Sequence, residues 1–115
     1  MKNEKIQILK VEPGKSPVFT EIENSVEAMQ EMVGGFIQKV DPWGGDVALI
    51  CNEDGRLLGL PPNRVIFDST GHVFDIIHGT YFLCLAPRNS EHFTSLPKML
   101  AGRFEKRMIN SINVN

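Results

Sequence analysis

The fold is decided by the stretch Asp46-Val-Ala-Leu-Ile-Cys-Asn-Glu-Asp-Gly-Arg-Leu-Leu-Gly-Leu-Pro-Pro-Asn-Arg-Val65. It opens with a compact apolar run, Val47 to Cys51, which is typical of a strand. An Asn-Glu-Asp-Gly turn follows, and leucines resume the apolar pattern until a Pro-Pro pair stops strand pairing. This order predicts a central hairpin whose end holds Asn63 and Arg64 out on a stiff backbone.

Upstream, the sequence predicts a hairpin and a short helix. Residues 6–11 and 18–22 carry strand patterns and flank a turn rich in Pro and Gly at 13–17. Asn24 followed by Glu27 matches a capping box, and Gly34-Gly35 supplies the stop, which together predict a helix over about 25–33. A further apolar segment at 36–40 leads into a loop at 41–45.

Downstream, apolar segments at 65–67 and 73–85 are separated by a turn at 68–71. Gly79 inside the longer segment predicts a bulge or a close approach of the backbone. Ser95 as a cap and Pro97 in the first turn predict the start of a last helix. Its apolar residues recur every four positions, at Leu96, Leu100, Phe104 and Met108. We expect the end of the chain to be frayed unless a partner holds it.

These elements predict an α+β fold. We expect a mostly antiparallel sheet, with a short helix after the N-terminal hairpin and a C-terminal helix, the helices packing on one face. No repeat, low-complexity tract or linker divides the chain. We therefore predict a single domain over 1–115, with a core at about 5–108 and a tail at 109–115.

The composition narrows the classes of function. A net charge of -2 and a pI near 5.9 disfavour a dedicated binder of phosphate backbones, although a local basic patch is compatible with both values. Cys51 and Cys84 lie inside apolar runs, where a thiol behaves as a small core residue. No segment reaches the roughly 20 apolar residues of a membrane helix, and the N-terminus has no long apolar region. We expect a cytoplasmic protein that does not use a membrane.

Polar residues at the central hairpin form the first candidate site. Asn52, Asn63 and Arg64 would converge there, and an arginine fork with amide groups suits a phosphate, a carboxylate or a nucleotide. The alternative is an ordinary turn asparagine and an arginine that pairs with Glu53 or Asp54.

Two further features carry candidate binding residues. Trp43, beside a proline and two glycines, would stack on a base or anchor a protein interface, or would instead cap the edge of the core. The basic residues of the last helix would bind nucleic acid or an acidic partner, or would simply complement the helix dipole. These basic residues are Lys98, Arg103, Lys106 and Arg107.

Catalysis and metal binding are not predicted. His72, His78 and His92 are scattered without the spacing of zinc ligands. The chain has no nucleophile elbow, no Cys/His signature and no phosphate loop, and Cys84 lies between two leucines in a stretch that reads as core. We therefore predict that the protein is not an enzyme and uses no cofactor or metal.

Five segments together resemble a known family. They are Val11-Glu-Pro-Gly-Lys15, the Gly34-Gly35 helix end, Leu49-Ile-Cys-Asn-Glu-Asp-Gly55, Leu58-Gly-Leu-Pro-Pro-Asn-Arg64 and Asp75-Ile-Ile-His-Gly-Thr-Tyr-Phe82. The chain resembles, over roughly residues 5 to 107, domain-of-unknown-function family 3846, whose members are small proteins of bacteria, phages and conjugative elements. The Asn-Glu-x-Gly and Gly-Leu-Pro-x-Asn-Arg pair is the most specific part of the resemblance. The resemblance implies no activity, and it implies the setting of an accessory gene of a mobile element.

These observations lead to two hypotheses of function. The first is a non-enzymatic binding module of a phage or mobile element, which inhibits a host defence protein or sequesters a small anionic or nucleotide ligand in the host cytoplasm. Exposed strand edges would also allow a homo-oligomer. The alternative is a nucleic-acid-binding regulator that uses the basic C-terminal helix.

Overall fold

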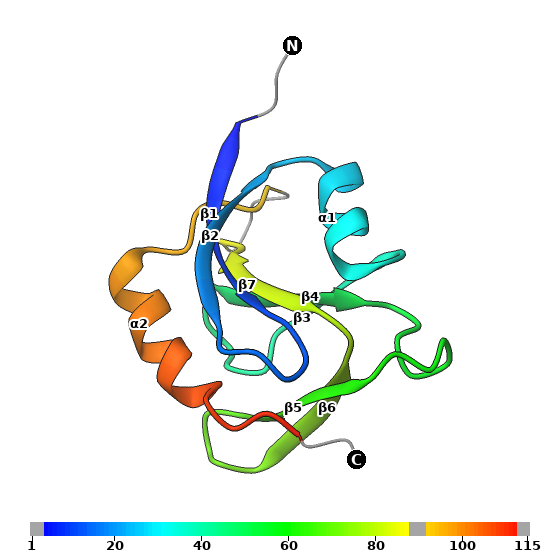
Figure 1. Cartoon of the computed structure of the whole chain (residues 1–115). Coiled ribbons are helices and arrows are strands. Elements are labelled where there is room, and N and C mark those ends of the chain that lie inside the picture. Colours follow the sequence, from blue (N-terminus) through cyan, green and yellow to red (C-terminus); the bar gives the residue numbers. More distant parts are fainter. Residues whose placement is uncertain (1–3, 88–91, 113–115) are drawn as a thin grey trace.

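The computed structural model describes residues 4–87 and 92–112. In chain order, its elements are β1 (Lys5–Val11), β2 (Val18–Glu23), α1 (Val26–Val33), β3 (Ile37–Val40), β4 (Val47–Asn52), β5 (Pro62–Phe67), β6 (Val73–His78), β7 (Tyr81–Leu85) and α2 (Lys98–Arg107). Five strands form one sheet in the order β2-β1-β7-β4-β3, and β5 and β6 form a separate two-stranded ribbon (Figure 1). The named strands pair antiparallel, so the predicted α+β class is confirmed.

The five-stranded sheet has a hydrophobic core on each face. Ile8 and Ile50 pack in the core that α1 covers, whereas Leu9 and Leu49 pack in the core that α2 and the ribbon cover (Figure 1). Successive side chains of a strand point to opposite faces, so the two helices lie on opposite faces of the sheet. The prediction that the helices share one face is wrong. The buried run of β4 offers apolar side chains to both faces, and its sequence does not assign either helix to one of them.

Gly79 lies where the chain passes from the ribbon to the main sheet. Its φ of 83° is in the left-handed region that favours glycine. A Cβ at this position would lie 2.7 Å from Cδ1 of Leu60, and the Gly79 N–H donates to the Pro61 carbonyl at 2.8 Å. The predicted close approach of the backbone at Gly79 is confirmed.

The segment between β4 and β5 differs from the predicted hairpin. Residues 53–59 form consecutive turns, in which Leu58 N–H donates to the Asp54 carbonyl at 2.9 Å and Leu60 N–H to the Gly55 carbonyl at 3.0 Å. Leu57 is 87% exposed, so the leucines do not form a returning strand. Strand β5 begins at Pro62, since the first residue of a strand tolerates proline.

The helix boundaries were predicted closely, but the capping residues were not. Ser25 caps α1, because its hydroxyl accepts from Ala28 N–H at 3.1 Å, while the side chain of Asn24 donates to the Phe93 carbonyl. Helix α2 starts after Pro97 without a side-chain cap. The predicted cap, Ser95, instead accepts from the Gln7 N–H at 2.9 Å and ties the approach to α2 to β1.

The apolar stripe of α2 packs as predicted. Leu96, Phe104 and Met108 are buried against the sheet. Beyond the helix, Ile112 N–H donates to the Asn63 carbonyl at 3.0 Å, so part of the predicted tail contacts β5; residues 113–115 lie outside the described residues. Neither helix in the described ranges has the length and apolar character needed to cross a membrane.

Candidate functional site

Asn52 holds the end of α1 against the turn that follows β4. Its side-chain amide donates to the Val33 carbonyl at 3.1 Å, and its side-chain oxygen accepts from Asp54 N–H at 2.8 Å. The residue is 6% exposed. Both ends of its amide are therefore engaged inside the protein, and Asn52 meets the description of a turn asparagine.

Asn63 and Arg64 are buried rather than held out in solvent. The structure places Asn63 at 0% and Arg64 at 2% exposure, so the predicted exposed tip is wrong. The pairing of β5 with β6 shifts register between Pro62 and Arg64. A bulge of this kind releases consecutive residues from strict alternation, which allows both side chains to enter the interior.

Arg64 joins three segments of the chain. Its Nε donates to the Met108 carbonyl at the end of α2, and one of its terminal nitrogens donates to the Lys15 carbonyl in the β1–β2 turn, each at 2.7 Å. Its other terminal nitrogen donates to the side-chain oxygen of Asn63, also at 2.7 Å. Burial lowers the pKa of the Arg64 guanidinium from its ordinary value. The partners in these bonds are oxygens of Met108, Lys15 and Asn63, not the predicted carboxylates of the turn.

Asn63 completes this internal network. Its side-chain amide donates to the carbonyls of Val11 and Gly79, each at 2.9 Å, while its oxygen accepts from Arg64. The network links β1, the Gly79 turn and β5. Asn63 and Arg64 are therefore structural residues that fix the ribbon and α2 to the main sheet.

Trp43 is half-buried and firmly oriented. Its indole N–H donates to the Phe67 carbonyl at 3.0 Å, and its ring lies 4.6 Å from the Phe104 ring, centroid to centroid, in an edge-to-face arrangement. It therefore packs at the edge of the core, as the second reading of this residue predicted, and keeps part of its surface accessible.

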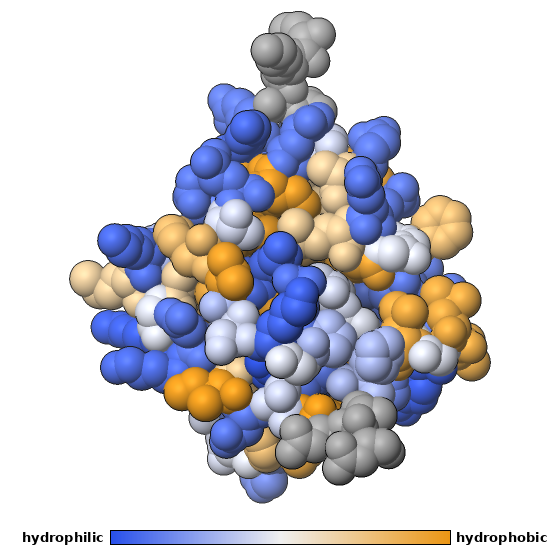
Figure 2. Space-filling model, in the orientation of Figure 1, coloured by the Kyte–Doolittle hydropathy of each residue, from blue (hydrophilic) through white to orange (hydrophobic). Residues whose placement is uncertain are grey.

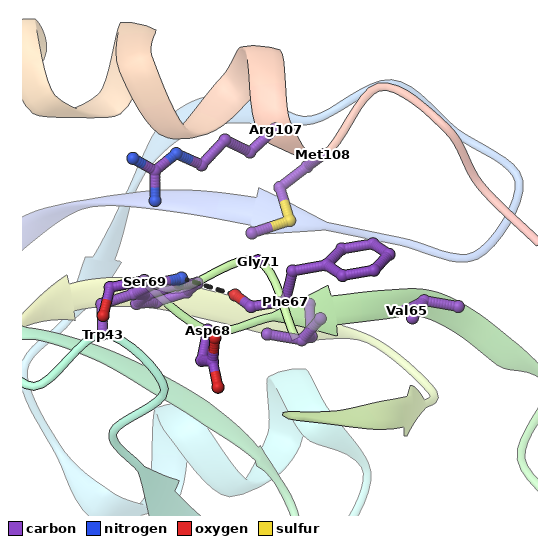
Figure 3. A pocket seen from close by; sticks show the side chains of 9 residues that line it. Trp43, Val65, Phe67, Asp68, Ser69, Gly71, Arg107 and Met108 are labelled. Atoms are coloured by element: carbon purple, nitrogen blue, oxygen red, sulfur yellow. Dashed lines mark hydrogen bonds between the residues drawn. The ribbon is translucent and has the colours of Figure 1, made fainter. Parts of the chain in front are cut away.

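A cleft of about 350 Å³ opens beside Trp43. Figure 3 shows Arg107 of α2 and the next residue, Met108, on one side of it and the turn after β5 on the other, where Trp43 is bonded to Phe67. The lining residues are Trp43, Val65, Ile66, Phe67, Asp68, Ser69, Gly71, Arg107 and Met108.

Asp68 folds the turn that forms one wall of this cleft. One of its carboxylate oxygens accepts from the hydroxyl of Thr70 at 2.6 Å and from the backbone N–H groups of Thr70 and His72 at 2.9 and 3.0 Å. The Thr70 hydroxyl in particular holds the pKa of Asp68 below its usual value. Asp68 is therefore an ionised residue whose bonds stabilise its own turn.

The opposite wall is the last turn of α2. The Arg107 guanidinium lies 4.8 Å from the centre of the Phe104 ring, a cation–π contact. Arg107 is exposed and forms no ion pair with any described residue. Met108 beside it is fixed twice, because its carbonyl accepts from Arg64 and its sulfur accepts from the Tyr81 hydroxyl at 3.0 Å.

The structure regroups the predicted site residues. It brings Trp43 from one candidate set together with Arg107 from another, and it moves Asn52, Asn63 and Arg64 into the interior. Sequence reasoning missed Phe67, Ser69 and Met108 as cleft residues. The turn at 68–71 was predicted, but no local pattern indicates that this turn faces α2.

The two cysteines are buried, and the described residues contain no cluster of metal-binding side chains. Cys51 and Cys84 are buried free cysteines, as predicted, and burial raises the pKa of Cys51 to about 11 and that of Cys84 to about 12. The described residues include no group of three or more His, Cys, Asp or Glu side chains that would hold a metal ion.

No curated protein and no solved structure matches the chain. A family model described as a domain of unknown function (DUF3846) matches residues 6–109. The matched range runs from β1 to just beyond α2 and includes both walls of the cleft. The chain therefore belongs to the family of domains of unknown function named DUF3846.

Proposed function

We propose that this protein is a non-enzymatic binding module that holds a small anionic ligand with a planar apolar part in the Trp43–Arg107 cleft. The observation that carries the proposal is the presence of an oriented tryptophan and an unpaired arginine, far apart in the sequence, in one cleft. The two residues supply different kinds of recognition, an apolar surface and a permanent positive charge.

The size and lining of the cleft support this proposal. Its volume of about 350 Å³ falls within the roughly 300–1,000 Å³ of small-molecule sites. Trp43, Phe67 and Met108 offer apolar surface, and Arg107 offers a guanidinium that matches a phosphate or carboxylate. Trp43 is already held by Phe67 and Phe104, so binding would cost little side-chain entropy at this residue.

The charged groups of the cleft favour binding over catalysis. The Asp68 oxygen that folds the turn already accepts three hydrogen bonds, and the guanidinium of Arg107 is a hydrogen-bond donor without an acceptor atom. Neither group has the arrangement of a general base with an orienting partner. This supports the non-enzymatic part of the proposal.

The biological setting is a further part of the proposal and rests on the resemblance of the sequence. We infer an accessory protein of a phage or other mobile element, which acts on the host by removing a ligand or by occupying a host protein. Such a protein would act in the host cytoplasm. A homo-oligomer stays compatible with this role.

A specific surface favours the second candidate, inhibition of a host protein. Leu57 and Leu58 are 87% and 60% exposed on the turn between β4 and β5, and Phe36 is 68% exposed after α1. Figure 2 shows apolar surface over the turn that protrudes on the right of the view. Exposed apolar residues on a hydrogen-bonded turn suit a protein interface.

The fluorescence of Trp43 tests the leading proposal directly, because Trp43 is the single tryptophan of the chain. We expect adenosine and guanosine monophosphates to quench its emission to saturation. Arg107→Ala should weaken this binding about tenfold to hundredfold, the range for hydrogen bonds to a charged group. Lys98→Ala removes the same charge from α2 outside the cleft and is the matched control. Unchanged emission with every anionic probe would reject the cleft as the site.

A further inference from the structure

The cationic residues of α2 extend beyond the cleft. Arg103 lies one helical turn before Arg107, and Lys106 neighbours Arg103 at i,i+3 on the helix surface. The three side chains are exposed, and none of them forms an ion pair with a described residue. A ligand confined to the cleft would use Arg107 and leave the other two cations without a partner.

The single acidic residue of α2, Glu105, lies on the other side of the helix from Arg103 and Arg107. Glu105 lines a different groove, which runs along the β1–β2 turn with Ser16, Pro17, Lys106 and Ile109. Lys98 falls on the same border of the helix as Glu105, by the helical period of 100° per residue. The cleft side of α2 therefore carries Arg103 and Arg107, and Lys106 lies between them and the mixed border that holds Glu105 and Lys98.

Acidic residues lie in the two loops on the other side of the cleft, and Asp68 is the one among them that lines it. Asp41 and Asp46 are exposed on either side of Trp43 in the loop, and Asp68 lies in the turn below α2. An anionic polymer would be attracted along α2 and repelled from these two loops. With positive charge on one side and negative charge on the other, the surface favours a single strand of nucleic acid and disfavours a duplex, whose second phosphate backbone would face the acidic loops.

We infer that the ligand of the cleft is a segment of single-stranded nucleic acid. One base packs against Trp43 inside the cleft, and the neighbouring phosphates follow Arg107, Lys106 and Arg103 along α2. Stacking on an aromatic residue beside a positive groove is the usual physical basis of single-strand binding. The inference rests on the proposed function, since it names the ligand class of the same cleft.

A comparison of three probes tests the inference. The probes are a dye-labelled single strand of about ten nucleotides, which is within the range of a small site, a duplex of the same sequence, and adenosine monophosphate. Binding of the labelled strands is followed by anisotropy, and quenching of Trp43 is followed with unlabelled ones. We expect the single strand to bind more tightly than both other probes and to quench Trp43.

The salt dependence assigns the phosphate contacts. Three phosphate contacts on a single strand predict a slope of about -2 for the logarithm of the binding constant against the logarithm of the salt concentration. Arg103→Ala should make this slope shallower by about 0.7. Lys98→Ala, with the same change of charge, should leave affinity and slope unchanged. Trp43→Ala should weaken binding about fivefold to 150-fold, and the quenching of the native protein gives the same information if this variant does not fold.

Four results would overturn the inference. Equal affinity for the duplex contradicts the role of the acidic loops. If adenosine monophosphate binds as tightly as the single strand, the ligand contacts only the cleft, and the proposed function still holds. Strand binding without a change in Trp43 emission shows that no base enters the cleft. If none of the three probes changes the Trp43 emission or the anisotropy, the inference is rejected, and the proposed function is rejected as well only if the other anionic probes also leave the emission unchanged.

Discussion

The Nε of Arg64 donates to the backbone carbonyl of Met108 at 2.7 Å, so a buried cation closes the carboxyl end of α2. The last carbonyls of a helix have no partner within the helix, and a positive charge at this end interacts favourably with the helix dipole. Met108 and the preceding Arg107 line the cleft. Arg64, which the sequence suggested as a ligand contact, thus lies in the interior. It acts on the cleft only by fixing the end of α2.

Replacement of Arg64 should destabilise the protein strongly. Arg64→Met keeps much of the volume but leaves the carbonyls of Lys15 and Met108 without their donor, and we expect a loss of about 3 kcal/mol in the free energy of unfolding. Urea denaturation measures this loss. The control is Arg56→Ala, which removes an exposed ion pair with Asp75 and should cost less than about 1 kcal/mol. Equal effects of the two changes would contradict the structural role of Arg64.

Gly79 should be intolerant of a side chain for two separable reasons. Gly79→Ala places a Cβ at a φ of 83° and 2.7 Å from Leu60 Cδ1, whereas Gly14→Ala places one at a φ of 72° in open space. Strain in the left-handed region costs about 1–2 kcal/mol at either position, and we expect Gly79→Ala to cost more. In a Leu60→Ala background the difference between the two costs should shrink, because the 2.7 Å contact with Cδ1 is removed and the 3.3 Å contact with the Cβ of residue 60 remains. Chemical denaturation of the variants, with Leu60→Ala alone as the reference, checks this expectation.

Local patterns predicted the secondary structure better than they predicted the site. Strands, helix lengths and the apolar stripe of α2 follow from residue periodicity, which acts over a few residues. Asn24 and Ser25 are adjacent residues that both favour a helix cap, so the pattern could not select Ser25. The inward position of Arg64 depends on a bulge in β5, and the meeting of Trp43 with Arg107 depends on the packing of distant elements. Neither relationship leaves a local signal.

The buried thiols should make stability fall at alkaline pH. The pKa of Cys51 is raised from 9.0 to about 11 and that of Cys84 to about 12, chiefly by burial, so the folded state binds more protons than the unfolded state above pH 9. Their contribution is complete below pH 9 and is lost as the pH rises through 11 and 12. Urea midpoints at increasing pH measure the loss, and the raised pKa of the buried Tyr81 adds to it.

A cysteine variant separates the thiol contribution from that of the tyrosine. Cys84→Ala removes one titrating thiol, so the alkaline decline should be shallower than in the native protein, even though the variant is less stable at neutral pH because of the lost packing. Identical slopes in the two proteins would show that the Cys84 thiol does not contribute. The native thiols should also resist alkylation at pH 8 until denaturant is added, since the thiolate is the reactive form.

The apolar turn after β4 should contribute little to stability. Leu57 and Leu58 are 87% and 60% exposed, and the turn is held by backbone bonds such as Leu58 N–H to the Asp54 carbonyl. Leu57→Ser and Leu58→Ser should therefore change the free energy of unfolding by no more than about 0.5 kcal/mol. Ile66→Ser is the matched control, because Ile66 is 1% exposed and its replacement puts a hydroxyl into the core. A large loss of stability in the turn variants would mean that the leucines are packed in solution, by this chain or by a second copy, and analytical ultracentrifugation would distinguish these two states.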